Sequence, residues 1–222
     1  MRELFHVPLS PFCRKVRIVL KEKGLPFALK TENVWERREE FLVMNPAAKV
    51  PVLVEADGTV LADSTAIVEY LQEVQPQPDL LGGNPAQRAE TRRLVAWFDE
   101  KMYLEATQNI FGEKVQKRFL GQGEPDSATV RAGLANIRVH LDYLAWLVER
   151  RTWLAGNNFS LADVAAAAQF SCIDYIGDVP WSHQEAARDW YARVKSRPSF
   201  QSLLDDRLPG LRPVSHYDDL DF

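Results

Sequence analysis

The sequence predicts a two-domain protein, with a small α/β domain followed by an all-helical domain. Strand and helix patterns alternate over the first part of the chain. Residues 76–85 then hold three prolines and two glycines, a composition typical of a linker between domains. Beyond them strand patterns almost vanish, and this separation of patterns indicates separate α/β and α domains. We expect a domain over 1–76, a linker over 77–84, a helical domain over 85–208 and a tail over 209–222.

Hydrophobic periodicity and turn residues place the elements of the first domain. Gly24 favours the end of the first helix, because glycine adopts a left-handed backbone at no steric cost. Asp57-Gly58 suits a tight turn, so the residues on either side are predicted to form a hairpin. The expected order is strand 3–7, helix 11–24, strand 27–31, a loop with a short helix over 33–44, hairpin strands 52–54 and 59–61, and a helix from Ser64.

The second domain is expected to be a set of helices. Ser160, with Asp163 three residues later, resembles the capping box that opens many helices. The tail is interrupted by Pro209, Gly210 and Pro213, so it is expected to be irregular. The expected helices cover 86–111, 127–149, 160–175, 183–196 and 199–207.

Composition excludes several classes of function. The chain has 222 residues, of which 46% are hydrophobic and 26% charged, as is usual for globular proteins. A net charge of −4 argues against nucleic-acid binding. No apolar run resembles a signal peptide or reaches membrane-spanning length. Cys13 and Cys172 are too few for a disulfide framework or a structural zinc site. We therefore expect a cytoplasmic protein without a metal, a nucleic-acid partner or a membrane partner.

Ser10-Pro11 stands where a strand passes into a helix, and two interpretations are open. Serine is a preferred N-cap and proline a preferred first helical residue, so capping alone explains the pair. The Ser10 hydroxyl is also suited to donate a hydrogen bond to a bound thiolate. Lowering a thiol pKa from about 8.5 to about 6.5 requires roughly 2.7 kcal/mol. One hydrogen bond to a charged group supplies about 1.5–3 kcal/mol, and a helix N-terminus about 0.3–1 kcal/mol.

Two further pairs of residues have both a structural and a functional interpretation. Val50-Pro51 precedes the hairpin and either marks a strand start or contains a cis-proline that exposes the Val50 backbone to a peptide-like ligand. Asp63-Ser64 reads as a helix cap, or as a site where free N–H groups receive a carboxylate. Lys49 is either a solvated charge or the holder of a second carboxylate.

Cys13, His6 and Trp35 also have a structural interpretation beside a functional one. Cys13 follows Ser10 at the spacing of a redox C-x-x-C motif whose first cysteine is replaced, but a buried helical cysteine is the favoured interpretation. His6 is interpreted as a strand residue and not as a base. Trp35 is unlike the other tryptophans, because charged and polar residues surround it in the sequence.

Taken in order, these motifs resemble those of the cytosolic glutathione transferases, with a pattern closest to the serine-type tau-like and cysteine-type omega-like branches. The motifs are the Ser-Pro-Phe run, residues 14–20, residues 49–53, Asp63-Ser64 and residues 159–163. The resemblance implies a thioredoxin-like first domain and a homodimer. It also implies that glutathione is bound as cosubstrate. Asp63 stands where the family more often has Glu, and Ser10 stands where omega-like members have Cys.

The same resemblance assigns a role to each candidate residue. Ser10 would activate the glutathione sulfur, and Val50 would pair with the cysteinyl backbone, with Pro51 cis. Asp63 and Ser64 would hold the γ-glutamyl end, and Lys49 the glycyl end. The leading hypothesis is therefore conjugation of glutathione to a small electrophile. Phe12, Tyr103 and Phe111 are candidates for its apolar pocket, on the assumption that the long helix from Ala86 faces the first domain.

Two alternatives remain open. Trp35-Glu36 and the chain end, with Asp219, Asp221 and Phe222, resemble the FtsZ-localising branch of this family in α-proteobacteria. That resemblance implies a non-catalytic scaffold that binds the division filament protein FtsZ without glutathione, and aromatic side chains are common anchors of such contacts. The bland interpretation is a tail without function and a tryptophan packed on its own domain. The other alternative is a glutathione-dependent reductase that uses Cys13.

Overall fold

The first domain is built on a mixed sheet, and the computed structural model describes it within residues 1–220 of the chain. Over that range the sheet has four strands in the order β2-β1-β3-β4. β1 and β2 are parallel, while β1 with β3 and β3 with β4 are antiparallel. A parallel pair needs a crossover, and the first helix provides it. The strands are β1 (Arg2–His6), β2 (Phe27–Thr31), β3 (Val52–Val54) and β4 (Val60–Ala62).

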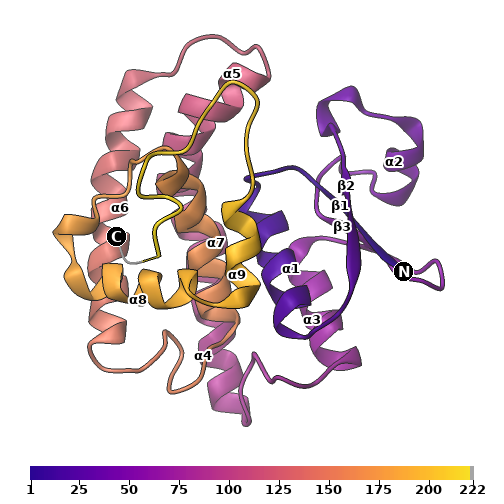
Figure 1. The fold of residues 1–222 in the computed structure, drawn as a ribbon, viewed down its shortest axis with the longest axis horizontal. Helices are drawn as coiled ribbons and strands as arrows, with labels where there is room; N and C mark the ends of the chain where they lie inside the picture. The colour runs from indigo at the N-terminus through magenta and orange to yellow at the C-terminus, as the bar shows by residue number, and fades with distance from the viewer. Residues whose placement is uncertain (221–222) are drawn as a thin grey trace.

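Helices cover both faces of this sheet. Figure 1 shows α1 (Pro11–Glu22) and α3 (Ser64–Val74) between the sheet and the helical domain, and α2 (Glu39–Met44) on the other side. α2 packs through Phe41, whose ring centroid lies 6.0 Å from that of Phe5 in β1. A 3₁₀ turn, η1 (Val34–Glu36), connects β2 to α2.

α1 is buried on two sides. Its apolar residues, such as Val16 and Leu20, belong to the core. Its charged residues Arg14, Lys15 and Arg17 are also buried, and two helices of the second domain, α7 (Leu161–Tyr175) and α9 (Pro198–Leu204), lie against α1. The amphipathic pattern therefore predicts the helix correctly, but its polar face meets protein and not solvent.

The second domain consists of helices, as the sequence predicts. The helix predicted over 86–111 is longer in the structure, where it continues without a break to Phe119. Its middle part is π-helical, with hydrogen bonds five residues back, as from Lys117 N–H to the Gly112 carbonyl. The elements are α4 (Pro85–Ala96), η2 (Trp97–Gln116), α5 (Lys117–Phe119), α6 (Ser127–Val148), α7 (Leu161–Tyr175), η3 (Trp181–His183), α8 (Glu185–Lys195) and α9 (Pro198–Leu204).

α7 is the central helix of this domain, and all its residues are buried. The predicted capping box is present at its start. The Asp163 carboxylate accepts hydrogen bonds from the Ser160 N–H at 3.0 Å and the Ser160 hydroxyl at 2.9 Å. It also accepts from the Leu154 N–H at 3.0 Å and the Trp190 indole N–H at 2.9 Å. One carboxylate thus joins α7 to α8 and to the preceding loop.

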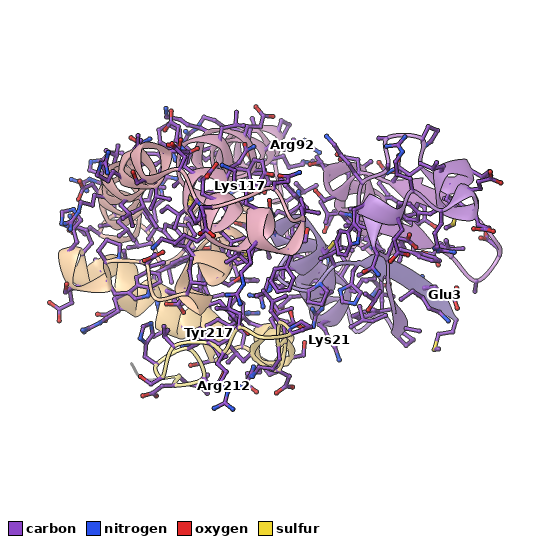
Figure 2. The ribbon with its side chains drawn as sticks, turned by 90° about the horizontal axis from the view of Figure 1, so that it is seen from above. Glu3, Lys21, Arg92, Lys117, Arg212 and Tyr217 are labelled. Atoms are coloured by element: carbon purple, nitrogen blue, oxygen red, sulfur yellow. The ribbon has the colours of Figure 1, made fainter. Side chains whose placement is uncertain are left out.

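The tail forms no regular helix or strand over its described part, yet it is docked on the second domain. Tyr217 is fully buried, and its ring centroid lies 5.1 Å from that of Tyr175 in α7. His216 Nε2 lies 3.1 Å from Asp174 Oδ1, and the Val214 N–H donates to the Tyr175 carbonyl. Figure 2 shows Arg212 and Tyr217 along one side of the helical domain, away from Glu3 of β1. Asp221 and Phe222 lie outside the described residues.

Across residues 1–220, every helix is too short or too polar to cross a membrane.

Candidate functional site

The register of the sheet brings the predicted glutathione-site residues to one edge. Phe5 of β1 lies opposite Val52 of β3, and Val52 lies opposite Ala62 of β4. Because these pairs are antiparallel, the end of β1, the start of β3 and the end of β4 lie side by side. Ser10 follows β1, Val50-Pro51 precedes β3 and Asp63-Ser64 follows β4, so all three stand at this edge. α1 and α3 both begin there, with the positive ends of their dipoles toward the same region.

Ser10 is half-buried and caps α1. Its Oγ accepts a hydrogen bond from the Cys13 N–H at 3.4 Å, so the capping interpretation is present in the structure. A hydroxyl that accepts from the backbone keeps its own proton for a second acceptor. The turn before it is tight, with Leu9 at φ 59° and the Ser10 N–H donating to the Val7 carbonyl at 3.2 Å.

The Val50-Pro51 peptide bond is cis. This is the geometry implied by the family resemblance, and Val50 remains half-buried. Lys49 is exposed, and its carbonyl accepts a hydrogen bond from the Asn45 side-chain amide at 2.7 Å. The loop before β3 is therefore held from Asn45, while the Lys49 ammonium extends toward solvent.

Asp63 acts as the N-cap of α3. Its carboxylate accepts from the Thr65 N–H at 2.7 Å and the Ala66 N–H at 3.1 Å, and the residue has a left-handed φ of 75°. Ser64 is buried directly behind it as the first helical residue. The capping interpretation of this pair is present, and the exposed side of the Asp63 carboxylate can still receive a ligand cation.

Two of the three residues assigned to the electrophile pocket are neighbours. Phe12 of α1 and Tyr103 of η2 are both half-buried, and their rings meet edge to face with centroids 4.9 Å apart. Burial raises the pKa of the Tyr103 hydroxyl, so it stays protonated at neutral pH. Phe111 is only 3% exposed and belongs to the core.

Cys13 and His6 lie in settings that suit packing. Burial raises the pKa of the Cys13 thiol to about 11, so the thiol stays protonated and a weak nucleophile at neutral pH. Burial also lowers the pKa of His6 to about 4, with the nearby Arg17 acting in the same direction. Neither environment favours the reductase hypothesis.

Trp35 lies in η1, in the loop between β2 and α2. Its side chain is 49% exposed, so it is not packed into its own domain as the bland interpretation would require. Asp219 lies at the other end of the chain, beside α8, where its carbonyl accepts a hydrogen bond from the Lys195 ammonium. The two predicted partner-binding regions therefore belong to different domains.

A buried ionic cluster between the domains is not predicted by the sequence. Arg17 Nη1 lies 2.8 Å from Asp206 Oδ2, and Arg14 Nη2 lies 3.1 Å from the same oxygen. Lys15 Nζ lies 2.5 Å from Asp99 Oδ2. Asp206 and Asp99 come from the helical domain, far along the chain, and only the tertiary fold brings them to α1. No local sequence signal indicates this pairing.

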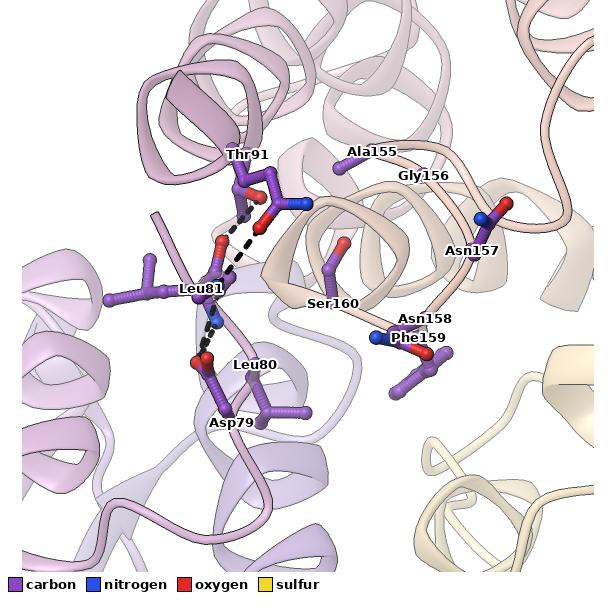
Figure 3. Close-up of a pocket in the computed structure, with 13 residues that line it drawn as sticks. Asp79, Leu80, Leu81, Thr91, Ala155, Gly156, Asn157, Asn158, Phe159 and Ser160 are labelled. Carbon is purple, nitrogen blue, oxygen red and sulfur yellow. Dashed lines mark hydrogen bonds between the residues drawn. The ribbon is translucent and has the colours of Figure 1, made fainter. Parts of the chain in front are cut away.

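A separate cavity of about 110 Å³ lies between the linker and the loop before α7 (Figure 3). Several of its polar groups bond within the protein: the Thr91 hydroxyl donates to the Leu81 carbonyl, and the Ser160 hydroxyl donates to Asp163. The Leu161 N–H donates to the Leu80 carbonyl at 2.8 Å. These bonds attach the linker to α7, so the cavity is explained as part of the domain connection.

Known proteins share this architecture along the whole chain. Residues 4–79 match the glutathione S-transferase N-terminal domain, and residues 108–198 match its C-terminal domain. FtsZ-localized protein A of Caulobacter vibrioides is 49% identical, over 100% of this chain and 98% of its own. Glutathione S-transferase 2 of Saccharomyces cerevisiae is 29% identical, over 92% of this chain and 90% of its own.

Two solved structures have nearly the same backbone. A glutathione S-transferase from Rhodospirillum rubrum F11 aligns with a TM-score of 0.98 and 54% identity over 100% of both chains. FzlA from C. crescentus aligns with a TM-score of 0.97 and 49% identity, over 100% of this chain and 99% of that one. The predicted fold class, an α/β domain followed by an all-α domain, is confirmed. The chain belongs to the glutathione S-transferase family, and it is similar to FtsZ-localized protein A over its whole length.

Proposed function

We propose that this protein is a glutathione transferase-fold scaffold that binds the bacterial division filament protein FtsZ. The supporting observation is the full-length similarity to a protein named for its localisation with FtsZ, at 49% identity. Relatives named as glutathione S-transferases among the curated proteins are more distant, such as the yeast protein at 29% identity. Among the curated relatives this difference favours the scaffold as the main function. The solved structure from Rhodospirillum rubrum F11, named as a glutathione S-transferase, is 54% identical, so conjugation is kept as the second candidate.

The exposed Trp35 gives this proposal a physical basis. Tryptophan is enriched among the residues that dominate protein–protein binding energies, because it buries a large area at a small cost in conformational entropy. An exposed tryptophan on a turn outside the core contributes little to folding, so partner binding explains its presence better than stability does. Asp219 and the chain end are proposed as a second contact with the same filament.

The test is co-sedimentation with FtsZ polymerised by GTP. We expect the wild type to pellet with the filaments and Trp35→Ala to bind at least tenfold more weakly. Trp146→Ala is the matched control, because Trp146 of α6 is exposed to nearly the same degree, 48% against 49%. Absence of wild-type pelleting, or equal losses in the two variants, contradicts the proposal.

Glutathione conjugation is the second candidate, and the sheet register favours it. Ser10, the cis Val50-Pro51 peptide and the start of α3 stand at one edge, as a site for an extended tripeptide requires. We expect retention on immobilised glutathione and turnover of a chlorodinitrobenzene-type electrophile. Ser10→Ala should lose most turnover, by about 10–100-fold, since one hydrogen bond to a charged group is worth about 1.5–3 kcal/mol. A wild type that neither binds nor turns over ends this candidate.

The proposal includes a homodimer, as the family resemblance implies, and a cytoplasmic location, as the composition predicts. Light scattering of the purified full chain tests the assembly. A monomer mass at micromolar concentration would contradict it.

A further inference from the structure

The loop that carries Trp35 is tied at its base to the edge of the sheet. β2 ends at Thr31, and the next N–H, of Glu32, still donates to the carbonyl of His6 in β1 at 2.9 Å. The Glu32 side chain is only 1% exposed, although glutamate is rarely buried without a partner. The partner is the Arg38 guanidinium, which stands on the far side of the loop.

Two nitrogens of the Arg38 guanidinium donate hydrogen bonds to the Glu32 carboxylate. Its Nη2 donates to Glu32 Oε2 at 2.6 Å, and its Nε donates to Glu32 Oε1 at 3.3 Å. A guanidinium fork on a carboxylate fixes direction as well as distance, which a single charge cannot do. The two side chains therefore close residues 33–37 into a loop whose ends are held together.

The closed loop is also bonded internally. The Glu36 N–H donates to the Asn33 carbonyl at 2.8 Å, and the Asn33 side-chain amide donates to Glu36 Oε1 at 2.8 Å. Arg37 ends the turn with a left-handed φ of 49°. Trp35 lies at the middle of this turn, so its exposed ring projects from a backbone with little freedom.

We propose that Glu32 and Arg38 are positioning residues that hold Trp35 ready for its protein partner. The inference rests on the proposed function and explains how the Trp35 contact gains affinity for FtsZ. Ordering a loop during binding costs free energy, and a loop that is already ordered avoids this cost. The expected gain is about tenfold in affinity, which corresponds to about 1.4 kcal/mol.

The experiment compares three variants of the full chain in the FtsZ co-sedimentation assay. Arg38→Ala should bind about tenfold more weakly than the wild type, and Arg38→Lys should fall between them, because an ammonium keeps the charge but not the fork. Arg37→Ala is the matched control, since it removes the same charge from the same exposed loop. It should stay within about twofold of the wild type.

A second readout follows the indole itself. The polarised emission intensities of each protein, minus those of its Trp35→Phe counterpart, isolate Trp35 from the other tryptophans and give its anisotropy. This Trp35 anisotropy should fall in Arg38→Ala and remain unchanged in Arg37→Ala. Equal binding losses in these two variants, or mobile Trp35 with unchanged binding, overturns the inference. If the wild type does not pellet, the proposed function is contradicted independently of this inference. An unchanged Trp35 anisotropy in Arg38→Ala still contradicts the positioning role of Glu32 and Arg38.

Discussion

Two aspartates begin two helices in this molecule, and their surroundings differ. Asp63 caps α3 from the surface and accepts two backbone N–H bonds. Asp163 stands in the first turn of α7, is fully buried and accepts from four donors: two on Ser160, one on Leu154 of the preceding loop and one on Trp190 of α8. Burial raises the pKa of Asp163, while each of these hydrogen bonds opposes the rise.

The comparison shows that burial changes what the same carboxylate does. On the surface, water can replace a lost cap, so the cost of losing Asp63 is local. In the interior, each donor left without an acceptor keeps its full desolvation cost. Asp163 therefore serves packing, whereas Asp63 keeps an accessible oxygen that a ligand can use. The candidate ligand site therefore lies at Asp63, where the capping carboxylate is exposed.

The largest expected effect is at Asp163. Asp163→Ala leaves four buried donors without their acceptor, so unfolding free energy should fall by about 4 kcal/mol or more. Urea denaturation followed by circular dichroism measures it. A loss below about 1 kcal/mol would contradict the view that burial gives Asp163 a larger contribution to unfolding free energy than Asp63.

Asp206 is a carboxylate whose burial lies between that of Asp63 and that of Asp163. Its side chain is 11% exposed and neutralises Arg14 and Arg17 between the domains. Asp206→Ala leaves two buried cations without their partner, and we expect a loss of about 3 kcal/mol in unfolding free energy. The neighbour Asp205 is exposed, so Asp205→Ala is the control and should stay within about 0.5 kcal/mol of the wild type. Similar losses in both variants would contradict this assignment.

At Asp63 the expected stability loss is smaller. Asp63→Ala should cost about 1 kcal/mol, the usual value of an N-cap, and Asp63→Asn should cost much less because asparagine also caps. If glutathione binds at this edge, Asp63→Asn should nevertheless weaken retention on a glutathione resin, since the charge is lost. Equal retention of wild type and Asp63→Asn would limit Asp63 to its capping role.

The smallest expected effect is a pH dependence at His216. The hydrogen bond to Asp174 raises the pKa of His216 above 6.5, so the folded state favours the protonated ring. The pair then stabilises the protein below about pH 6.5, and this contribution is lost as the pH rises through the folded-state pKa. Because the ring is partly exposed, we expect less than about 1 kcal/mol. The difference between wild type and His216→Ala in thermal melts should be larger at pH 5.5 than at pH 8.5; an equal difference would contradict the ion pair.

Local signals predict most of the fold. Gly24, Asp57-Gly58 and the Ser160–Asp163 box lie where the sequence indicates helix ends, a hairpin and a helix start. Each of these depends on residues close together in the chain. The register that gathers Ser10, Val50 and Asp63 is also accessible, because once the strands and their directions are known, their ends must meet.

The parts that the sequence does not predict depend on distant contacts. Arg14 and Arg17 have the spacing of a solvated helix face, and their partner Asp206 is nearly the whole chain away. Tyr217 belongs to a segment interrupted by prolines, yet it is buried against α7. Likewise the Glu32–Arg38 pair is local, but the near-complete burial of Glu32 depends on packing that no periodicity shows. These features decide how the domains join and how the Trp35 loop is held.

The position of α1 has a consequence for how the molecule denatures. This one helix supplies the first domain with core side chains and the second with its interfacial cations. Loss of the second domain would expose Arg14 and Lys15 without their carboxylates, and loss of the first would leave Asp206 and Asp99 without their cations. We therefore expect a single cooperative melting transition, and no folded fragment from cleavage at residues 77–84.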